Sequence, residues 1–437
     1  MRAGHGGHVC EQCSAGYPAP GGLPWLFADP RGAAAAWRAR LTLLLGELRR
    51  EAAACGAAVT ADVSSRTRER LGLLEAAYRD HADRLAGLLE PFGTGTAAAS
   101  HDTLQALRTR LPGSQGLTNY YANIHRDWAW GEDENQASLA LLTSVIDAGL
   151  AGERVLVLGA GAGRLAYDLH RAQQPALTFA MDINPLLLAV AREMYAGRSL
   201  ELYEFPIAPR GIADHARLRT LRAPAPADER LHLIAGDALH APFEPGTFDV
   251  VVTPWFIDIV EAPFTLLAAR VNGLLADGGR WLNLGSVAFA SAQRAEQLSL
   301  EEALQVVQQC GFAPPVVREA ELPYMRSPAS RHARIESTVA WCARRHSAAT
   351  EPAAPDLLPP HLLDATLPVP LPPELAAHAA ATRIHAFLLS LIDGRRSLAD
   401  IAGVLVEQRM MAPADAAPAV RAFLLRLHED AARRANY

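Results

Sequence analysis

The feature that most constrains the fold is an apolar run that ends in closely spaced glycines. Residues 154–163 read RVLVLGAGAG, so a short buried strand is followed at once by Gly159, Gly161 and Gly163. A helical stretch, RLAYDLH, comes next. Glycines at such a turn let the backbone bend tightly and let a ligand approach it closely. The segment therefore predicts a strand, a ligand-binding turn and a helix, although an incidental glycine turn would give the same local pattern.

Further along the chain, strand-like runs alternate with helix-like runs. Four more strand candidates are LTFAMDIN, LHLIAGDA, FDVVVTPWF and GRWLNLGS, and the helix candidates between them are LLLAVAREMYAG and APFTLLAARVNGLLADGG. Strands that alternate with helices form a parallel sheet that is covered on both faces. The expected fold class is therefore α/β, a Rossmann-like domain with a parallel-rich central sheet over residues 116–345.

Acidic residues after two of these strands distinguish between the cofactors that use a glycine turn. Asp182 ends the second strand, where a carboxylate can accept hydrogen bonds from both ribose hydroxyls. Asp237, followed by Ala238, comes after the third strand, and Arg164 occupies the last position of the dinucleotide fingerprint GxGxxG. With the later FDVV and DGG segments, this order resembles class I methyltransferases, which bind the phosphate-free S-adenosylmethionine, more than it resembles NAD or FAD enzymes.

Composition excludes several kinds of chemistry and partner. All 41 basic residues are arginine, so a lysine Schiff base and a P-loop lysine are excluded. The formal charge of −6 gives no reason to expect a nucleic acid as partner. The five scattered cysteines do not resemble a disulfide framework. No signal-peptide core and no apolar run of about 18 residues is visible, so we expect a cytoplasmic protein that does not enter a membrane.

The chain divides into five stretches of different composition. Residues 1–30 are rich in glycine and proline, residues 31–115 show helical periodicity, and residues 116–345 carry the α/β pattern. A proline-rich stretch over 346–373 is expected to form a stiff linker, and residues 374–437 are again helical in pattern. At 437 residues, more than one hydrophobic core is expected.

Several segments of the central stretch resemble the carnosine N-methyltransferase family. The resemblance covers about residues 120–345 and rests on the order of the RDW, GAGxGRLA, FID and NLG segments. It implies methylation, dependent on S-adenosylmethionine, of an imidazole nitrogen in a histidine-containing small molecule or peptide. The segments that carry it are NIHRDWAWGEDEN, GAGAGRLAYDLH, LYEFPIAP, PWFIDIVEAPFTLL, WLNLGSVAF and QLSLEEALQVVQQCGF.

The resemblance implies roles for residues at matching positions. Arg126, from the RDW segment, is expected to reach the carboxylate of the cofactor, and Asn123 stands where the family holds the cofactor with a glutamine. A surface ion pair is the alternative interpretation of Arg126. Tyr121 and Phe256 are expected near the substrate. The remaining members of the expected cofactor site are Gly159, Gly161, Gly163, Arg164, Asp182, Asp237 and Ala238.

Asp258, in the FID segment, is the expected catalytic residue, and the resemblance places it against the substrate. A neutral imidazole carries one N–H group and one free nitrogen. A carboxylate that accepts the N–H fixes the tautomer and stabilises the imidazolium that methylation creates. The position after the fourth strand also fits, because ligands bind at the carboxyl ends of parallel strands. A helix N-cap or a solvated loop acid is the alternative interpretation.

Two departures from the family leave the methyl acceptor open. Ala290 stands where the family has a substrate-contacting histidine, and HARIE offers Arg334 and Glu336 where the family has neighbouring tyrosines before a glutamate. Ala290 and Arg334 are counted among the expected substrate-binding positions. A different N, O or S acceptor therefore stays open. A non-catalytic peptide-binding protein with a vestigial cofactor fold is the third alternative, and the intact glycine turn argues against it.

The two flanks resemble accessory modules. Cys10 and Cys13 form a CxxC knuckle, and the following GLPWLF resembles the second half of a zinc ribbon. A tetrahedral zinc site needs four ligands, and only His5 and His8 are nearby, so a degenerate ribbon without metal is expected. The tail, with Ser397 as a helix N-cap, resembles PqqD-like winged-helix modules, which bind peptides. Three roles stay open for the tail: it binds a precursor peptide, it forms an ordinary helical cap, or it makes a homodimer contact.

Overall fold

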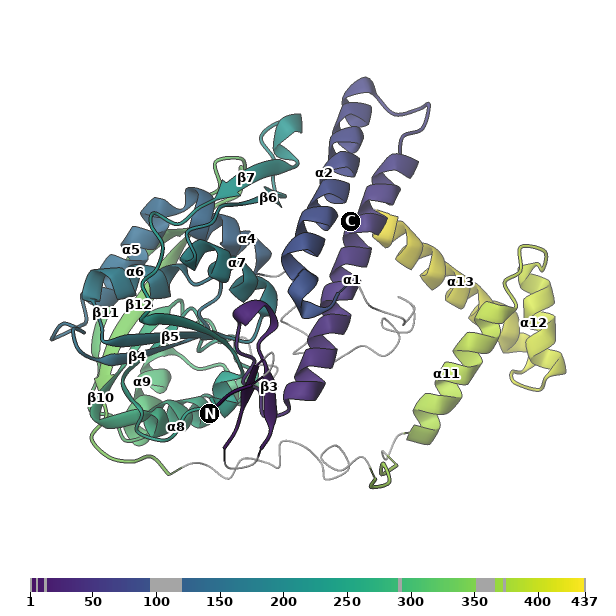
Figure 1. Cartoon of the computed structure of the whole chain (residues 1–437). Helices are drawn as coiled ribbons and strands as arrows, with labels where there is room; N and C mark the ends of the chain where they lie inside the picture. Colours follow the sequence, from purple (N-terminus) through teal and green to yellow (C-terminus); the bar gives the residue numbers. More distant parts are fainter. Residues whose placement is uncertain are drawn as a thin grey trace. The chain divides into compact units, whose positions relative to one another are not determined.

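The computed structural model describes residues 2–4, 7–11, 14–94, 120–289, 293–350, 366–371 and 375–435. The chain falls into two compact units, Met1–Ala354 and Pro355–Tyr437. The larger unit holds a twisted sheet and a long helical hairpin, and the smaller unit holds helices (Figure 1). His5, Cys13 and Ala290 lie outside the described residues.

A seven-stranded sheet forms the centre of the larger unit. Its strands, in chain order, are β4 (Arg154–Leu158), β5 (Leu177–Asp182), β8 (Leu231–Ala235), β9 (Phe248–Pro254), β10 (Leu275–Gly285), β11 (Val316–Tyr324) and β12 (Arg334–Arg344). Across the sheet they follow the order β11-β12-β10-β9-β4-β5-β8. In this sheet β12 alone runs against the direction of the other strands. The predicted α/β fold with a parallel-rich sheet is therefore confirmed.

Helices cover both faces of the sheet. One face carries α5 (Glu132–Thr143), α6 (Arg164–Gln173) and α7 (Pro185–Tyr195), and the other carries α8 (Phe264–Leu274) and α9 (Leu300–Gln309). The side chain of Val155 packs in the first core and that of Leu156 in the second. Successive strand side chains point to opposite faces, so a continuous apolar run such as β4 fills both cores.

The order of the strands creates a crevice at β4. The chain runs outward from β4 through β5 to β8, and then returns to β9 and runs outward through β10 in the other direction. Open α/β sheets bind ligands where the strand order reverses, at the carboxyl ends of the strands. The glycine turn at 159–163 starts at this point, directly after β4.

The segment before the sheet extends the edge of β8. Three short strands, β1 (Arg2–Gly4), β2 (Gly7–Val9) and β3 (Gly16–Pro18), form a small antiparallel sheet. The chain then meets β8, where the Leu26 N–H donates to the Ala235 carbonyl at 2.8 Å. Among the described residues, no group of three or more His, Cys, Asp or Glu side chains could hold a metal ion.

A long helical hairpin and an inserted ribbon lie beside the sheet (Figure 1). The hairpin consists of α1 (Pro30–Ala57) and α2 (Ser65–Leu89), whose first turns are capped by the side chains of the preceding Asp29 and Ser64. The ribbon, β6 (Leu200–Glu204) and β7 (Arg217–Leu221), packs against α2 and is inserted between α7 and β8.

Two buried histidines near this ribbon are expected to make the fold sensitive to acid. Burial lowers the pKa of His81 to about 4 and that of His125 to about 3, and within the described structure neither Nδ1 has a hydrogen-bond partner. An unfolded histidine titrates near pH 6.5. The unfolded chain therefore binds more protons below pH 6.5, and the folded state loses about 2 kcal/mol of stability for each histidine by about pH 5.

Urea unfolding of the full chain at pH 7 and pH 5 measures this loss. All seven tryptophans belong to the larger unit, so their fluorescence reports on that unit. In His81→Phe, the difference in unfolding free energy between the two pH values should shrink by about 2 kcal/mol. The exposed His346 provides the control, because His346→Gln should leave the difference unchanged. Equal pH dependence in wild type and His81→Phe would contradict the expectation.

The smaller unit contains α11 (Leu375–Ser390), α12 (Leu398–Glu407) and α13 (Pro413–Ala435). Ser397 caps α12 as expected, and Asp400 completes a capping box with it. The described residues of this unit include no strand, so the wing of a winged helix is not seen among them. A peptide partner or a homodimer contact stays a prediction. No described helix of the chain is long and apolar enough to cross a membrane.

Candidate active site

A cavity of about 590 Å³ lies at the carboxyl ends of the central strands. The glycine turn, the residues after β5, β8 and β9, and the ends of β11 and β12 contribute to its wall. Two helical segments add to it: α4 (Tyr121–His125) with the preceding Tyr120, and the π-helical turn η3 (Arg126–Trp130). Segments far apart in the sequence thus converge on the crevice that the strand order creates.

The glycine turn has the backbone conformation that its composition predicts. Gly159, Gly161 and Gly163 have φ values of 71°, 58° and 84°, in the left-handed region that glycine tolerates best. Gly159 and Gly161 line the cavity. Gly163 does not line it and instead precedes α6, where its carbonyl accepts a hydrogen bond from the Tyr195 hydroxyl at 2.7 Å.

Asp182 connects the end of β5 to the glycine turn. Its Oδ2 accepts the Gly161 N–H at 2.7 Å and its Oδ1 accepts the Asn184 N–H at 2.8 Å. Burial raises the pKa of Asp182 to about 6. The carboxylate lines the cavity, and its role as the acceptor for a pair of ribose hydroxyls stays a prediction.

Asp237 lies on the neighbouring part of the wall. Its Oδ1 accepts the Leu239 N–H at 2.9 Å, and its Oδ2 lies 2.7 Å from Nδ1 of His240. Asp237 and Ala238 line the cavity together with the apolar side chains of Met181 and Leu239. The acid suits the polar edge of a flat nucleobase, and the apolar side chains suit the face of its ring.

Arg126 brings a positive charge to the wall. Its Nε and Nη2 donate to Oδ1 of Asp127 at 2.9 and 2.7 Å, and its guanidinium carbon lies 5.5 Å from the ring centre of Tyr324. Burial opposes the charge, but Asp127 and Tyr324 outweigh it and keep the pKa of Arg126 above its ordinary value. Arg126 is therefore a buried cation on the cavity wall, which Asn123 also lines, and a surface ion pair is not its environment.

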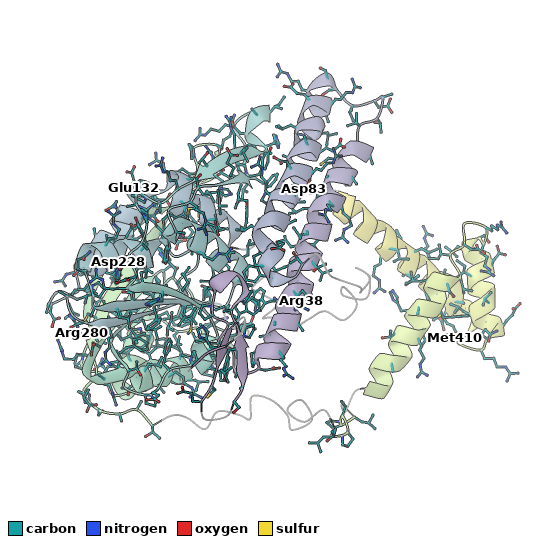
Figure 2. The ribbon with its side chains drawn as sticks, in the orientation of Figure 1. Arg38, Asp83, Glu132, Asp228, Arg280 and Met410 are labelled. Carbon is teal, nitrogen blue, oxygen red and sulfur yellow. The ribbon has the colours of Figure 1, made fainter. Side chains whose placement is uncertain are left out.

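Arg164 lies behind the wall and not on it. Its Nε donates to Asp168 at 2.8 Å, its Nη2 to Glu132 at 2.6 Å, and its Nη1 to the Asp127 carbonyl at 2.7 Å. Glu132 is labelled in Figure 2. These bonds hold η3, α5 and α6 together, and Arg164 does not line this cavity. The expected contact of Arg164 with the cofactor stays a prediction.

Asp258 lines the cavity just after β9. Its Oδ2 accepts the Ala288 N–H at 2.8 Å and lies 3.5 Å from the Ser286 hydroxyl. The helix that follows, α8, begins at Phe264 with Pro263 at its N-cap, so Asp258 is not a helix cap. The N-cap interpretation is therefore wrong, whereas a role against the substrate stays a prediction beside that of a solvated loop acid, because Asp258 is partly exposed in a turn.

Three other expected substrate positions differ in their surroundings. Phe256 lines the cavity next to Gly159. Tyr121 does not line it, because its hydroxyl donates to the Tyr203 carbonyl at 2.9 Å in the contact between α4 and β6. The neighbouring Tyr120 takes the place on the wall. Arg334 lines the cavity near its opening.

Three residues of the wall did not stand out in the sequence. Trp37 comes from α1, far ahead of the sheet, and is 3% exposed. Tyr324 ends β11 and lies 5.0 Å from the ring of Trp255. Glu134 belongs to the WGEDEN segment. Its carboxylate accepts the N–H groups of the two residues after Tyr324, Met325 at 3.0 Å and Arg326 at 2.7 Å. Of these three residues, only Glu134 lies in a segment on which the family resemblance rests, so nothing in the sequence indicated the other two.

Replacing Gly159 with alanine is expected to weaken binding at this cavity. A Cβ at Gly159 would lie 2.2 Å from Cδ2 of Phe256, so the ring or the turn, both of which line the cavity, must shift. We expect a loss of affinity for a nucleoside ligand of about tenfold or more, measured by calorimetry. Gly152→Ala is a matched control, because Gly152 has a φ of 81° but its added Cβ would meet no atom within 4 Å. Equal affinities in both variants would contradict the expectation.

Comparison with known proteins gives a family match over the sheet-containing part of the chain. A family model described as Carnosine N-methyltransferase matches residues 113–347. Carnosine N-methyltransferase unmet of Drosophila melanogaster is 23% identical over 251 residues, which are 51% of this chain and 53% of the fly protein. The match therefore spans about half the length of that relative.

Solved structures of methyltransferases also resemble the chain. Phosphoethanolamine N-methyltransferase 2 of Haemonchus contortus, in complex with S-adenosyl-L-methionine, is 16% identical, covers 58% of this chain and 61% of its own, and gives a TM-score of 0.35. An S-adenosylmethionine-dependent methyltransferase from Mesorhizobium loti is 14% identical, covers 48% of this chain and 100% of its own, and gives a TM-score of 0.34. Because the family model matches more than half of the 437 residues, the chain belongs to the carnosine N-methyltransferase family.

Proposed function

We propose that this protein transfers the methyl group of S-adenosylmethionine to an imidazole nitrogen of a histidine-containing small molecule or peptide. The observation that carries the proposal is the position of Asp258. Its carboxylate lines the same cavity as the glycine turn and Asp182, with one oxygen fixed by the Ala288 N–H. Membership of a family named for N-methylation of carnosine, an imidazole dipeptide, supports the same conclusion.

The residues of the cavity fit S-adenosylmethionine, which supplies an electrophilic methyl group on a sulfonium when it is bound. A Cβ built on Gly161 meets no atom within 4 Å, so this part of the turn is open. Asp182 can accept the ribose hydroxyls, and Arg126 can pair with the carboxylate of the methionine part. Asp237 and Leu239 offer an acid and an apolar surface for the base.

Asp258 acts on the acceptor. A neutral imidazole donates its N–H to this carboxylate, which leaves the lone pair of the other ring nitrogen free to attack. As that nitrogen gains the methyl group, the ring becomes a cation, and the nearby carboxylate stabilises the positive charge. No proton has to leave the acceptor before the transfer. The chain therefore needs neither a lysine nor another strong base for this step.

Aromatic side chains restrict the space around the acceptor. The rings of Trp255 and Tyr324 lie 5.0 Å apart beside Asp258 on the cavity wall. Trp255 has a φ of 50°, a backbone conformation that is unfavourable for a side chain of this size, and it lines the cavity wall. In-line displacement requires the attacking nitrogen about 3 Å from the methyl carbon, so rigid walls that limit the orientations of the ring contribute to the rate.

Two measurements on the full chain test the proposal. Calorimetry with S-adenosylmethionine should show micromolar binding, and its absence would support the vestigial alternative. Transfer of a labelled methyl group to histidine, carnosine, thiohistidines and histidine-containing peptides should then identify an imidazole acceptor by mass spectrometry. Transfer to some other N, O or S nucleophile, with every imidazole inactive, would reject the proposal and retain the methyltransferase.

A further inference from the structure

Arg334 is a charged residue on the cavity wall that the proposed reaction does not use. It stands directly opposite Tyr324 in the register between β12 and β11. Its guanidinium carbon lies 4.5 Å from the ring centre of Tyr324, which is a cation–π distance. Both residues line the cavity. The aromatic ring therefore supports the guanidinium on one side at the opening of the site.

Glu336 forms an ion pair with this guanidinium. Residues two apart on a strand share a face, and Oε1 of Glu336 lies 2.6 Å from Nε of Arg334. The Glu336 side chain is 15% exposed and the Arg334 side chain is 56% exposed, so the acid lies deeper. In the described part of the chain, no second carboxylate lies within ion-pair distance of Arg334. The guanidinium is therefore held between the Tyr324 ring and a single carboxylate, and more than half of the Arg334 side chain is open to solvent.

The proposed donor site uses one of the two arginines on the described cavity wall, and Arg334 is the other. Among the described residues that line the cavity, the basic side chains are those of Arg126 and Arg334. Arg126 is buried, bonded to Asp127 and placed for the methyl donor. The planar fork of an arginine matches the two oxygens of a carboxylate, and a guanidinium that is already oriented loses less entropy on binding one.

We propose that Arg334 binds a carboxylate of the methyl acceptor. The acceptor is then an imidazole compound with a free carboxylate, such as an imidazole amino acid or a peptide that ends in histidine. This inference rests on the proposed function, because it takes the imidazole end of the acceptor to lie at Asp258. A charged guanidinium on the wall selects the charge of the acceptor as well as its shape.

Binding measurements with matched ligands test the subsite. Calorimetry uses the full chain saturated with S-adenosylhomocysteine, which has no methyl group to transfer. The ligand pairs are carnosine with carcinine, which lacks the carboxylate, and L-histidine with L-histidinamide. We expect the wild type to bind the carboxylate member of each pair about tenfold more tightly. Arg334→Gln should remove this preference, whereas Arg318→Gln, at an exposed arginine of the same hairpin, should retain it.

The outcomes separate the subsite from the reaction. Equal affinity of the wild type within each pair, no binding of any of the four compounds, or an equal loss for both members in Arg334→Gln overturns the carboxylate subsite. If the pairs are discriminated but no imidazole is methylated, the proposed reaction fails and the subsite stands. If imidazoles are methylated without regard to the carboxylate, the subsite alone is rejected. Unchanged affinity for S-adenosylhomocysteine in both variants shows that the donor site is intact.

Discussion

Replacing Asp182 with alanine is expected to lower the affinity for S-adenosylmethionine by about 100-fold or more. Two losses combine. The carboxylate is the expected acceptor for the ribose hydroxyls, and hydrogen bonds to a charged group contribute about 1.5–3 kcal/mol each. The same oxygens hold the N–H groups of Gly161 and Asn184, so their removal also releases the glycine turn. Calorimetry on the folded full chain measures the change.

Two variants identify the cause of that loss. Asp182→Asn retains one oxygen acceptor for the backbone and should show an intermediate affinity. Asp249→Ala removes an aspartate from β9 that pairs with Arg154 outside the cavity, and it should bind the cofactor as the wild type does. If Asp182→Ala binds within threefold of the wild type, the donor pocket has been assigned to the wrong part of the chain.

The pH dependence of binding gives a second readout of the same residue. Burial raises the pKa of Asp182 to about 6, so in the ligand-free protein the carboxyl group takes up a proton as the pH falls below that value. The ionised form is the one that accepts ribose hydroxyls, so binding below pH 6 must first remove this proton. The affinity should fall by about tenfold for each pH unit below 6, and Asp182→Asn should not show this slope.

The sheet and the donor side of the cavity follow from local signals in the sequence. The apolar run of β4, the glycines after it and Asp182 at the end of β5 all occur within single strand-to-turn segments. Parallel connections then bring the carboxyl ends of these strands to one edge of the sheet, whatever the details of packing. Local pattern and general topology are therefore sufficient to predict that these residues meet on one wall of the cavity.

The acceptor side depends on pairings that a single sequence does not reveal. Tyr324 meets Arg334 because β11 and β12 pair in one particular register, and nothing in ELPYMRS or HARIE specifies that register. Trp37 reaches the cavity from α1 through packing between distant segments. The segment HARIE contains no tyrosine, and the aromatic ring beside Arg334 comes from the opposite strand.

Neighbouring positions in a motif also differ in the direction of their side chains. Arg164 follows the last glycine of the turn directly but extends away from the cavity to Asp168 and Glu132. Tyr121 adjoins Tyr120 on the wall, yet its hydroxyl bonds to the β6 backbone. On a helical segment, consecutive residues point in directions about 100° apart, so membership of a motif does not imply contact with the ligand.

Replacing Asp258 with asparagine is expected to lower kcat for methyl transfer by about 10²- to 10³-fold while the affinity for S-adenosylmethionine stays within twofold. Asparagine can still accept an N–H through its amide oxygen, so the variant retains the shape of the site and removes the charge. The charge matters most in the transition state, because the acceptor ring becomes cationic only as the new bond forms. The loss should therefore appear in kcat more than in KM.

A charge removed elsewhere provides the control for this variant. Asp277 has a fully exposed side chain that pairs with Arg345 at the far end of β10, so Asp277→Asn should leave kcat unchanged. Asp258→Ala should lose at least as much activity as Asp258→Asn, because it also frees the Ala288 N–H. If Asp258→Asn retains kcat within threefold of the wild type, this carboxylate does not stabilise the imidazolium.

The pH profile of the same variant separates the enzyme from the substrate. An imidazole acceptor attacks only when it is neutral, and a free histidine ring has a pKa near 6.5. The rate of the wild type at saturating S-adenosylmethionine should therefore fall as the pH drops below about 6.5, because the acceptor itself becomes protonated. Asp258→Asn should show the same acidic limb at a uniformly lower rate. A limb that disappears in the variant would instead mean that Asp258 acts as a base, which in-line attack by a neutral ring does not require.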